Sequence, residues 1–175
     1  MVKKFSHKKF YKRVEKLVVK LLGHEQMPVI LVPRHEWHAR SPKDYVLQDH
    51  PVKCICVYYR TDMAECVDDN TCVRRVMDMQ RIHMEDDDDI MYNFIIGGNE
   101  KVFEGRGWFH RSSTKLPWAR YHGNRIDIAY IGNYNGKNDL PFQMLEQQLN
   151  LVMFGQEKGY IVKNYTMIEE THKFL

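Results

Sequence analysis

The sequence lacks any apolar run long enough to cross a membrane. A spanning helix needs about 20 mainly apolar residues, and no such stretch occurs. A secretory signal is also missing, because the lysine-rich residues at the start are not followed by a continuous apolar segment. These absences predict a protein that stays inside the cell, or one that is extracellular if its export segment is missing from this sequence.

Cysteine is scarce, and the four cysteines form none of the Cys-x-x-Cys pairs that are typical of structural zinc sites. Cys54 and Cys56 lie two apart in the apolar run 52–59, so alternation along a strand puts both on one face. We expect these two residues to be buried thiols. Cys66 and Cys72 bracket a short polar loop.

The bulk of the chain lacks the positive charge that a nucleic-acid-binding face needs. Residues 1–26 hold eight Lys/Arg against two acidic residues, a net charge of +6, which leaves −3 for the rest of a chain whose net charge is +3. A dedicated nucleic-acid binder carries its basic residues on the folded surface, so we expect no nucleic acid as a partner. With 175 residues, 43% of them hydrophobic and 28% charged, the chain has the composition of one globular domain.

Residues 3–22 have the pattern of an amphipathic helix. Apolar residues recur along one face of a 3.6-residue period, lysines fill the other face, and Gly23 ends the pattern; the apolar residues are Phe10, Val14, Leu17, Val18 and Leu21. We therefore divide the chain into a basic helix and linker, residues 1–27, and a domain, residues 28–175. The helix either packs on its own domain or is solvated beside it, or it contacts a membrane surface or a partner protein.

The remaining pattern alternates strands and helices. The predicted strands are 28–33, 52–59, 91–96, 101–104 and 126–131, and the predicted helices are 71–84, capped by Asn70 or Thr71, and 141–158. The acidic run 85–89 predicts a solvated turn, and 166–175 predicts a frayed strand or tail. This order predicts an α/β domain with a mixed central sheet flanked by helices.

Five motifs in order then resemble a known family, the peptidoglycan recognition proteins, which are related to N-acetylmuramoyl-L-alanine amidases. They are Arg34-His35-Glu36-Trp37, Cys66-x5-Cys72, Gln80–Met84, the long stretch Tyr92–Asn99 continuing through Val102–Trp108, and Ile128–Tyr134. The resemblance covers roughly residues 29–163. It implies an amidase-like fold, a Cys66–Cys72 disulfide, a domain that lacks the family's last helix, and a role in innate immunity.

The resemblance also implies where a catalytic zinc ion would be bound, by two His and one Cys with an open position for water. The first ligand position is Tyr59, followed by Arg60 and Thr61 where the family often has His-His-Thr. The family's second ligand would fall in the segment 112–117, which contains no histidine in this chain, and the Thr-x-Cys-Pro-Gly segment that carries the third does not occur before Leu175. We therefore predict no metal, no cofactor, no catalytic residue and no enzymatic activity.

Muropeptide binding is a separate question. Tyr92 stands where the family has a groove tyrosine, and a guanidinium can hold a stem carboxylate with two hydrogen bonds. The candidate ligand-binding residues are Tyr59, Arg60, Tyr92, Trp108 and Arg125. Against this, the acidic residues 85–89 would repel the carboxylates of a stem peptide at close range, and Arg60 and Arg125 can also be read as ordinary surface arginines.

Three functions are therefore compatible with the sequence. The first is a non-catalytic receptor, co-receptor or decoy of innate immune signalling that binds peptidoglycan or muropeptide. The second is an interaction protein that pairs with other peptidoglycan recognition proteins and binds no peptidoglycan. The third is a residual zinc-dependent amidase, which the missing ligands disfavour. The basic helix, residues 3–22, adds peripheral membrane contact to the expected partners.

Overall fold

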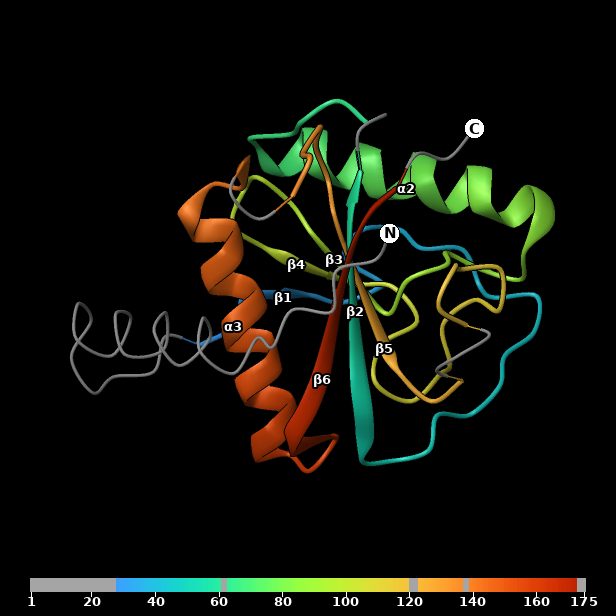
Figure 1. Ribbon diagram of the computed structural model, residues 1–175. Coiled ribbons are helices and arrows are strands. Elements are labelled where there is room, and N and C mark those ends of the chain that lie inside the picture. Colours follow the sequence, from blue (N-terminus) through green and yellow to red (C-terminus); the bar gives the residue numbers. More distant parts are fainter. Residues whose placement is uncertain (1–27, 61–62, 120–122, 137–138, 173–175) are drawn as a thin grey trace.

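The computed structural model describes residues 28–60, 63–119, 123–136 and 139–172 (Figure 1). The predicted helix at 3–22 and the domain boundary at residue 27 lie outside this part of the chain. No helix among the described residues is long and apolar enough to cross a membrane.

The described residues form a six-stranded sheet in the order β1-β4-β3-β5-β2-β6. All neighbouring strands are parallel except the β3–β4 hairpin. The strands are β1 (Leu31–Val32), β2 (Val52–Arg60), β3 (Phe94–Ile96), β4 (Val102–Glu104), β5 (Ile126–Tyr130) and β6 (Ile161–His172). The predicted mixed α/β sheet is thus confirmed.

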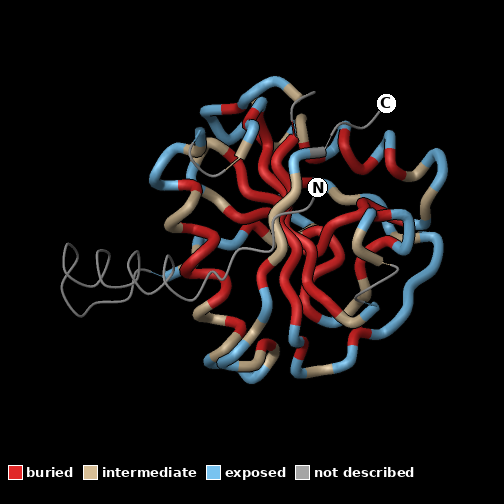
Figure 2. Tube along the Cα trace, in the orientation of Figure 1, coloured by how far each residue is buried: buried red, intermediate tan, exposed pale blue. Residues whose placement is uncertain are grey.

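Two helices cover opposite faces of this sheet (Figure 1). Helix α2 (Asp69–Asp86) packs on the face that carries Cys54, Cys56 and Tyr58, which we call the α2 face. Helix α3 (Phe142–Glu157) packs on the opposite face, the α3 face, which includes Ile55, Val57 and Tyr59 of β2. Because successive side chains of a strand alternate, β2 supplies both layers of the core, and the buried residues are concentrated along its length (Figure 2).

Helix α2 begins two residues earlier than predicted because a different residue caps it. The Asp68 side chain accepts a hydrogen bond from the Thr71 backbone N–H at 2.9 Å, and the Thr71 hydroxyl donates to the same carboxylate at 2.6 Å. An aspartate at this position satisfies a free N–H of the first turn. The predicted caps, Asn70 and Thr71, lie inside the helix.

The end of the chain also differs from the prediction. Of the two alternatives for 166–175, a frayed strand or a tail, the described residues form a strand, which pairs in parallel with β2 from Cys54↔Thr166 to Arg60↔His172 and begins earlier, at Ile161. The earlier start and the regular pairing were not predicted because the sequence mixes charged, polar and apolar residues without regular alternation. Pairing with a buried neighbour supplies the hydrogen bonds that the local pattern does not predict.

Candidate functional site

The end of β2, where the resemblance puts the first zinc ligand, carries Tyr59 on the α3 face. Its side chain is 2% exposed and stacks on Tyr130, with ring centroids 5.5 Å apart. Its hydroxyl donates a hydrogen bond to Glu169 Oε1 at 3.3 Å. Burial raises the pKa of the Tyr59 phenol, and the Glu169 charge raises it further, so this group stays neutral at ordinary pH.

The α2 face carries a buried ion pair beside the neighbouring tyrosine. Arg125 Nη2 lies 2.7 Å from Asp127 Oδ2, Arg125 Nε donates to Asp127 Oδ1 at 3.0 Å, and the Tyr58 hydroxyl donates to the same oxygen at 3.3 Å. Burial alone would lower the pKa of Arg125, but the charge of Asp127 and its hydrogen bond raise it overall. Arg125 therefore remains a cation and is held by a carboxylate of its own domain.

Tyr92 belongs to the same side of the sheet. Its ring lies 5.4 Å from that of Tyr58 and 5.7 Å from that of His83, and the residue is fully buried. The structure therefore brings Tyr92, Tyr58 and Arg125 into one region of the α2 face.

Trp108 lies on the α3 face of the sheet, opposite to Tyr92. Its ring packs on the α3 face against Phe94 at 4.6 Å and Tyr160 at 5.2 Å. The five candidate binding residues are thus divided between two faces of the sheet, and all five are buried; they are Tyr59, Arg60, Tyr92, Trp108 and Arg125. The interpretation of Arg60 and Arg125 as surface arginines is wrong, since 7% and 2% of these residues are exposed.

The acidic run 85–89 is likewise not a simple solvated turn. Asp89 is 3% exposed, lies 2.9 Å from Arg34 Nη1 and accepts a hydrogen bond from Gln80 Nε2 at 2.6 Å. Asp87 lies 2.5 Å from Arg106 Nη2. Asp89 can be buried, and the Asp87 side chain can be only 8% exposed, because each faces an arginine. Both arginines stand inside the motifs that carry the family resemblance, Arg-x-x-Trp and Gly-Arg-Gly-Trp.

Asp87 also links two loops. Its second carboxylate oxygen accepts a hydrogen bond from the Ser113 hydroxyl, and Lys115 Nζ donates to the Asp86 carbonyl. Burial alone would raise the pKa of Asp87, but the Ser113 hydrogen bond and the charge of Arg106 lower it overall. The segment 112–117, where the family's second zinc ligand would fall, is therefore held against the end of α2.

Asn93 explains why the Tyr-Asn-Phe and Gly-Trp segments occur together. Its amide group donates to the carbonyls of Gly107 and His110, both at 2.8 Å, and its amide oxygen accepts from the Asp127 backbone N–H at 2.8 Å. One buried side chain thus joins the start of β3, the turn after β4 and strand β5. The sequence motif contained this residue, but its role was not predicted.

The cysteines lie as the sequence interpretation expected. Cys66 and Cys72 form a disulfide with Cα atoms 5.1 Å apart. A Cβ on Gly98 would lie 2.2 Å from the Cys66 carbonyl oxygen, so only glycine lets this turn approach the disulfide loop. Cys54 and Cys56 are buried free thiols with sulfur atoms 3.9 Å apart.

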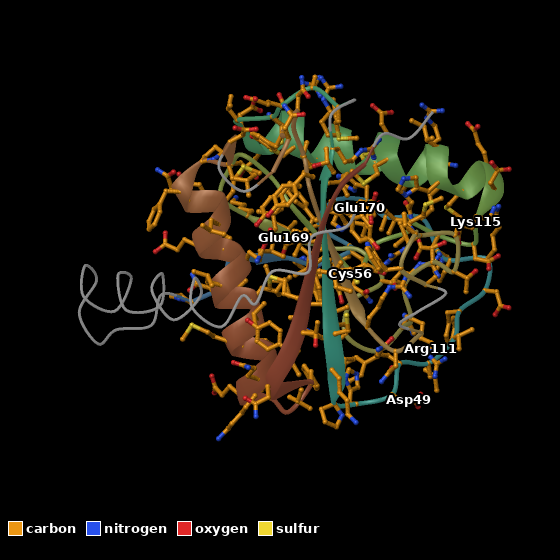
Figure 3. All side chains as sticks on the ribbon, viewed as in Figure 1. Asp49, Cys56, Arg111, Lys115, Glu169 and Glu170 are labelled. Carbon is orange, nitrogen blue, oxygen red and sulfur yellow. A yellow bond between two sulfur atoms is a disulfide. The ribbon has the colours of Figure 1, made fainter. Side chains whose placement is uncertain are left out.

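The residues at the expected ligand positions do not fit a zinc ion. Zinc in proteins is bound by Cys, His, Asp or Glu. Tyr59 is instead a neutral phenol that donates a hydrogen bond to Glu169, and the Ser113 hydroxyl donates a hydrogen bond to Asp87. Within the described residues, no three His, Cys, Asp or Glu side chains form a group that could hold a metal. Glu169 and Glu170, which are not among the predicted site residues, lie on the upper part of β6 (Figure 3).

The fold and this site define an amidase-like α/β domain in which Tyr59 and Ser113, at the described positions expected for the first two zinc ligands, are hydrogen-bonded to carboxylates. No protein-family model matches the chain. It is 34% identical to a peptidoglycan recognition protein of Trichoplusia ni over 79% of this chain and 74% of the relative. It is 32% identical to peptidoglycan-recognition protein LB of Drosophila melanogaster over 84% of this chain and 62% of the relative. The chain belongs to the peptidoglycan recognition protein family.

Solved structures agree with this assignment. The structure of bumblebee PGRP-SA has a TM-score of 0.73 at 26% identity, covering 81% of this chain and 83% of that chain. Drosophila PGRP-LB has a TM-score of 0.72 at 30% identity, covering 81% and 82%. A third similar structure, with a TM-score of 0.72 at 27% identity over 81% and 84%, contains tracheal cytotoxin bound to the ectodomain complex of peptidoglycan recognition proteins LCa and LCx.

Proposed function

We propose that this chain is a non-catalytic peptidoglycan recognition protein of innate immune signalling, which binds bacterial muropeptide or modulates other receptors of its family. The observation that carries the proposal is the state of Tyr59, a buried neutral phenol hydrogen-bonded to Glu169. An amidase of this family needs a metal ion there to acidify water and polarise the amide carbonyl. A buried phenol can supply neither a metal ligand nor an accessible general base.

Membership of the family supports ligand binding as the retained activity. Tracheal cytotoxin occupies a similar solved complex of two family members, and this chain keeps the same fold over most of its length. Of the candidate contacts, Tyr92 lies close to the Arg125–Asp127 ion pair. Its ring packs beside that of Tyr58, and the Tyr58 hydroxyl donates a hydrogen bond to Asp127. Tyr59, Arg60 and Trp108 remain predicted contacts.

One observation favours the second candidate, an interaction protein that binds no peptidoglycan. Arg125 is already neutralised by Asp127 and is 2% exposed. To hold a stem carboxylate, Arg125 would have to leave Asp127 as an uncompensated buried charge, which is strongly unfavourable. Recognition through this arginine therefore requires a rearrangement of the α2 face.

The experiment that tests the proposal combines binding and cleavage on the same sample. The purified full chain is incubated with insoluble peptidoglycan of the diaminopimelate type and of the lysine type, with zinc and with a chelator. We expect the chain in the pellet with at least one wall type, unaffected by the chelator, and no release of stem peptides. Zinc-dependent release would contradict the non-catalytic assignment. Absence from both pellets, with a catalytically competent family member as the positive control, would favour the interaction protein.

A further inference from the structure

Strand β6 is the longest strand of the sheet and lies at its edge. It spans the 12 residues Ile161–His172 and pairs on its inner side with β2, and the described residues place no strand on its outer side (Figure 1). Half of the backbone N–H and C=O groups of an edge strand point away from the sheet and can pair with another strand.

This edge has little of the protection that sheet edges usually carry. Native edges are blunted by proline, short length or charged residues, whereas β6 is long, has no proline, and has an uncharged central run of Asn-Tyr-Thr-Met-Ile at 164–168. Gln156 donates to the carbonyls of Val162 and Lys163 at one end of the strand. The central run is therefore the part of the edge that is suited to pairing.

The charges that flank this run are complementary to each other. Consider two copies of β6 paired antiparallel and related by a twofold axis perpendicular to the sheet. Residues that lie opposite each other then have side chains on the same face of the sheet. Because side chains alternate along a strand, the sequence positions of two opposite residues differ by an even number. When the axis passes through Thr166, Lys163 lies opposite Glu169 of the second copy, and Tyr165 lies opposite Met167. Opposite-charge pairs directly across an antiparallel sheet are stabilising, and a methionine sulfur makes favourable contacts with an aromatic ring.

Neighbouring registers lose this match. With the axis at Tyr165, Lys163 would face Met167, and with the axis at Met167, it would face Thr171. The register centred on Thr166 forms two Lys163–Glu169 pairs, one on each side of the axis. Glu169 also accepts the Tyr59 hydrogen bond, which holds its carboxylate at the end of the pairing region.

We propose that two copies of this chain associate through antiparallel pairing of their β6 edges, centred on Thr166, so that the two sheets become continuous. The dimer buries the open backbone groups of the central run and places a Lys163–Glu169 ion pair at each end. This association does not depend on muropeptide binding or on the absence of catalysis.

The test is sedimentation velocity of the full chain over a range of micromolar concentrations, with Lys163→Glu as the disrupting variant. This exposed residue would then face Glu169 with like charge at two places, and we expect dimer affinity to fall by about tenfold or more. The matched control is Lys158→Glu, which makes the same charge change at the end of α3 instead of on β6, and should leave the affinity unchanged. Lys163→Gln serves as a milder variant if the reversal disturbs folding.

Hydrogen exchange at low and high protein concentration locates the pairing region. The outward-pointing amides in 164–168 should become more protected as the dimer forms. A chain that remains monomeric throughout the concentration range overturns the proposal. A dimer that both charge reversals weaken equally, or one whose added protection lies outside β6, overturns it as well.

Discussion

The Tyr59 hydroxyl of β2 donates a hydrogen bond to the Glu169 carboxylate of β6 at 3.3 Å, although the two residues are 110 positions apart in the sequence. Parallel pairing of β2 with β6 brings them together. The contact places a neutral phenol, hydrogen-bonded to a carboxylate, at the end of β2.

Replacing Tyr59 by histidine will not restore a metal site. The substitution adds a single imidazole, at a position that is buried on the α3 face. It also removes the stacking of the Tyr59 ring on Tyr130. We expect Tyr59→His to lower the free energy of unfolding by about 1–3 kcal/mol without stoichiometric zinc binding, measured by denaturant titration and metal analysis. Tyr59→Phe, which keeps the ring, should cost only about 0.5–1.5 kcal/mol. Tight zinc binding by the histidine variant would contradict the account of this position.

The Arg125–Asp127 pair should show strong coupling between its two members. Removing one partner leaves a buried charge without compensation, so Arg125→Met or Asp127→Leu alone should cost about 3–5 kcal/mol in unfolding free energy. The double variant should recover much of this loss, because two apolar side chains need no compensation. A double-mutant cycle from urea denaturation measures the coupling. Additive losses would mean that the two side chains act independently.

Asp87 should make stability depend on acid pH. Its pKa is lowered in the folded protein by Ser113 and Arg106, so its contribution is present above the ordinary aspartate pKa of about 3.9. The contribution is lost as pH falls through the lowered folded pKa. We therefore expect Asp87→Asn to be destabilising near neutral pH and to converge with the parent protein in strong acid, in thermal melts over a pH series. Asp88→Asn, at an exposed neighbour, is the matched control and should change stability by less than about 0.5 kcal/mol.

The disulfide should stabilise the connection between β2 and α2. Closing a loop with a sequence separation of 6 restricts the unfolded chain, and the Cys66→Ser/Cys72→Ser double variant should lose about 2 kcal/mol on the chain-entropy account. Peptide mapping without reduction should recover Cys66 linked to Cys72. Cys54 and Cys56 should react with an alkylating reagent only after unfolding, since both are buried. A Cys54–Cys66 crosslink would contradict this arrangement.

Deleting residues 1–27 should leave the folded domain intact. Val29 is the first described residue packed against the α3-face core, and the segment before it carries the predicted basic helix. We expect little change in melting temperature and a loss of binding to anionic vesicles or partner proteins, since each basic residue near an anionic membrane contributes about 1 kcal/mol. A large fall in melting temperature with unchanged binding would show that the helix belongs to the core.

The sequence by itself determined the local features of this protein. Alternation along β2 predicted that Cys54 and Cys56 share a face, and the hairpin with its Gly-Gly-Asn turn followed from residues close together in the chain. The family motifs identified the fold because they depend on such local geometry. These features could be predicted because the covalent chain itself fixes the periods of strands and helices.

Only the tertiary structure decided which polar residues are buried and which partners they have. Asp89 was expected in solvent from its acidic neighbours, but Arg34 compensates its charge from 55 positions away. The pairing of Tyr59 with Glu169 likewise depends on β6 lying beside β2. Strand order and the meeting of opposite charges are properties of contacts between distant segments, and no local pattern in the sequence specifies them, because a side chain's exposure is set by what packs against it.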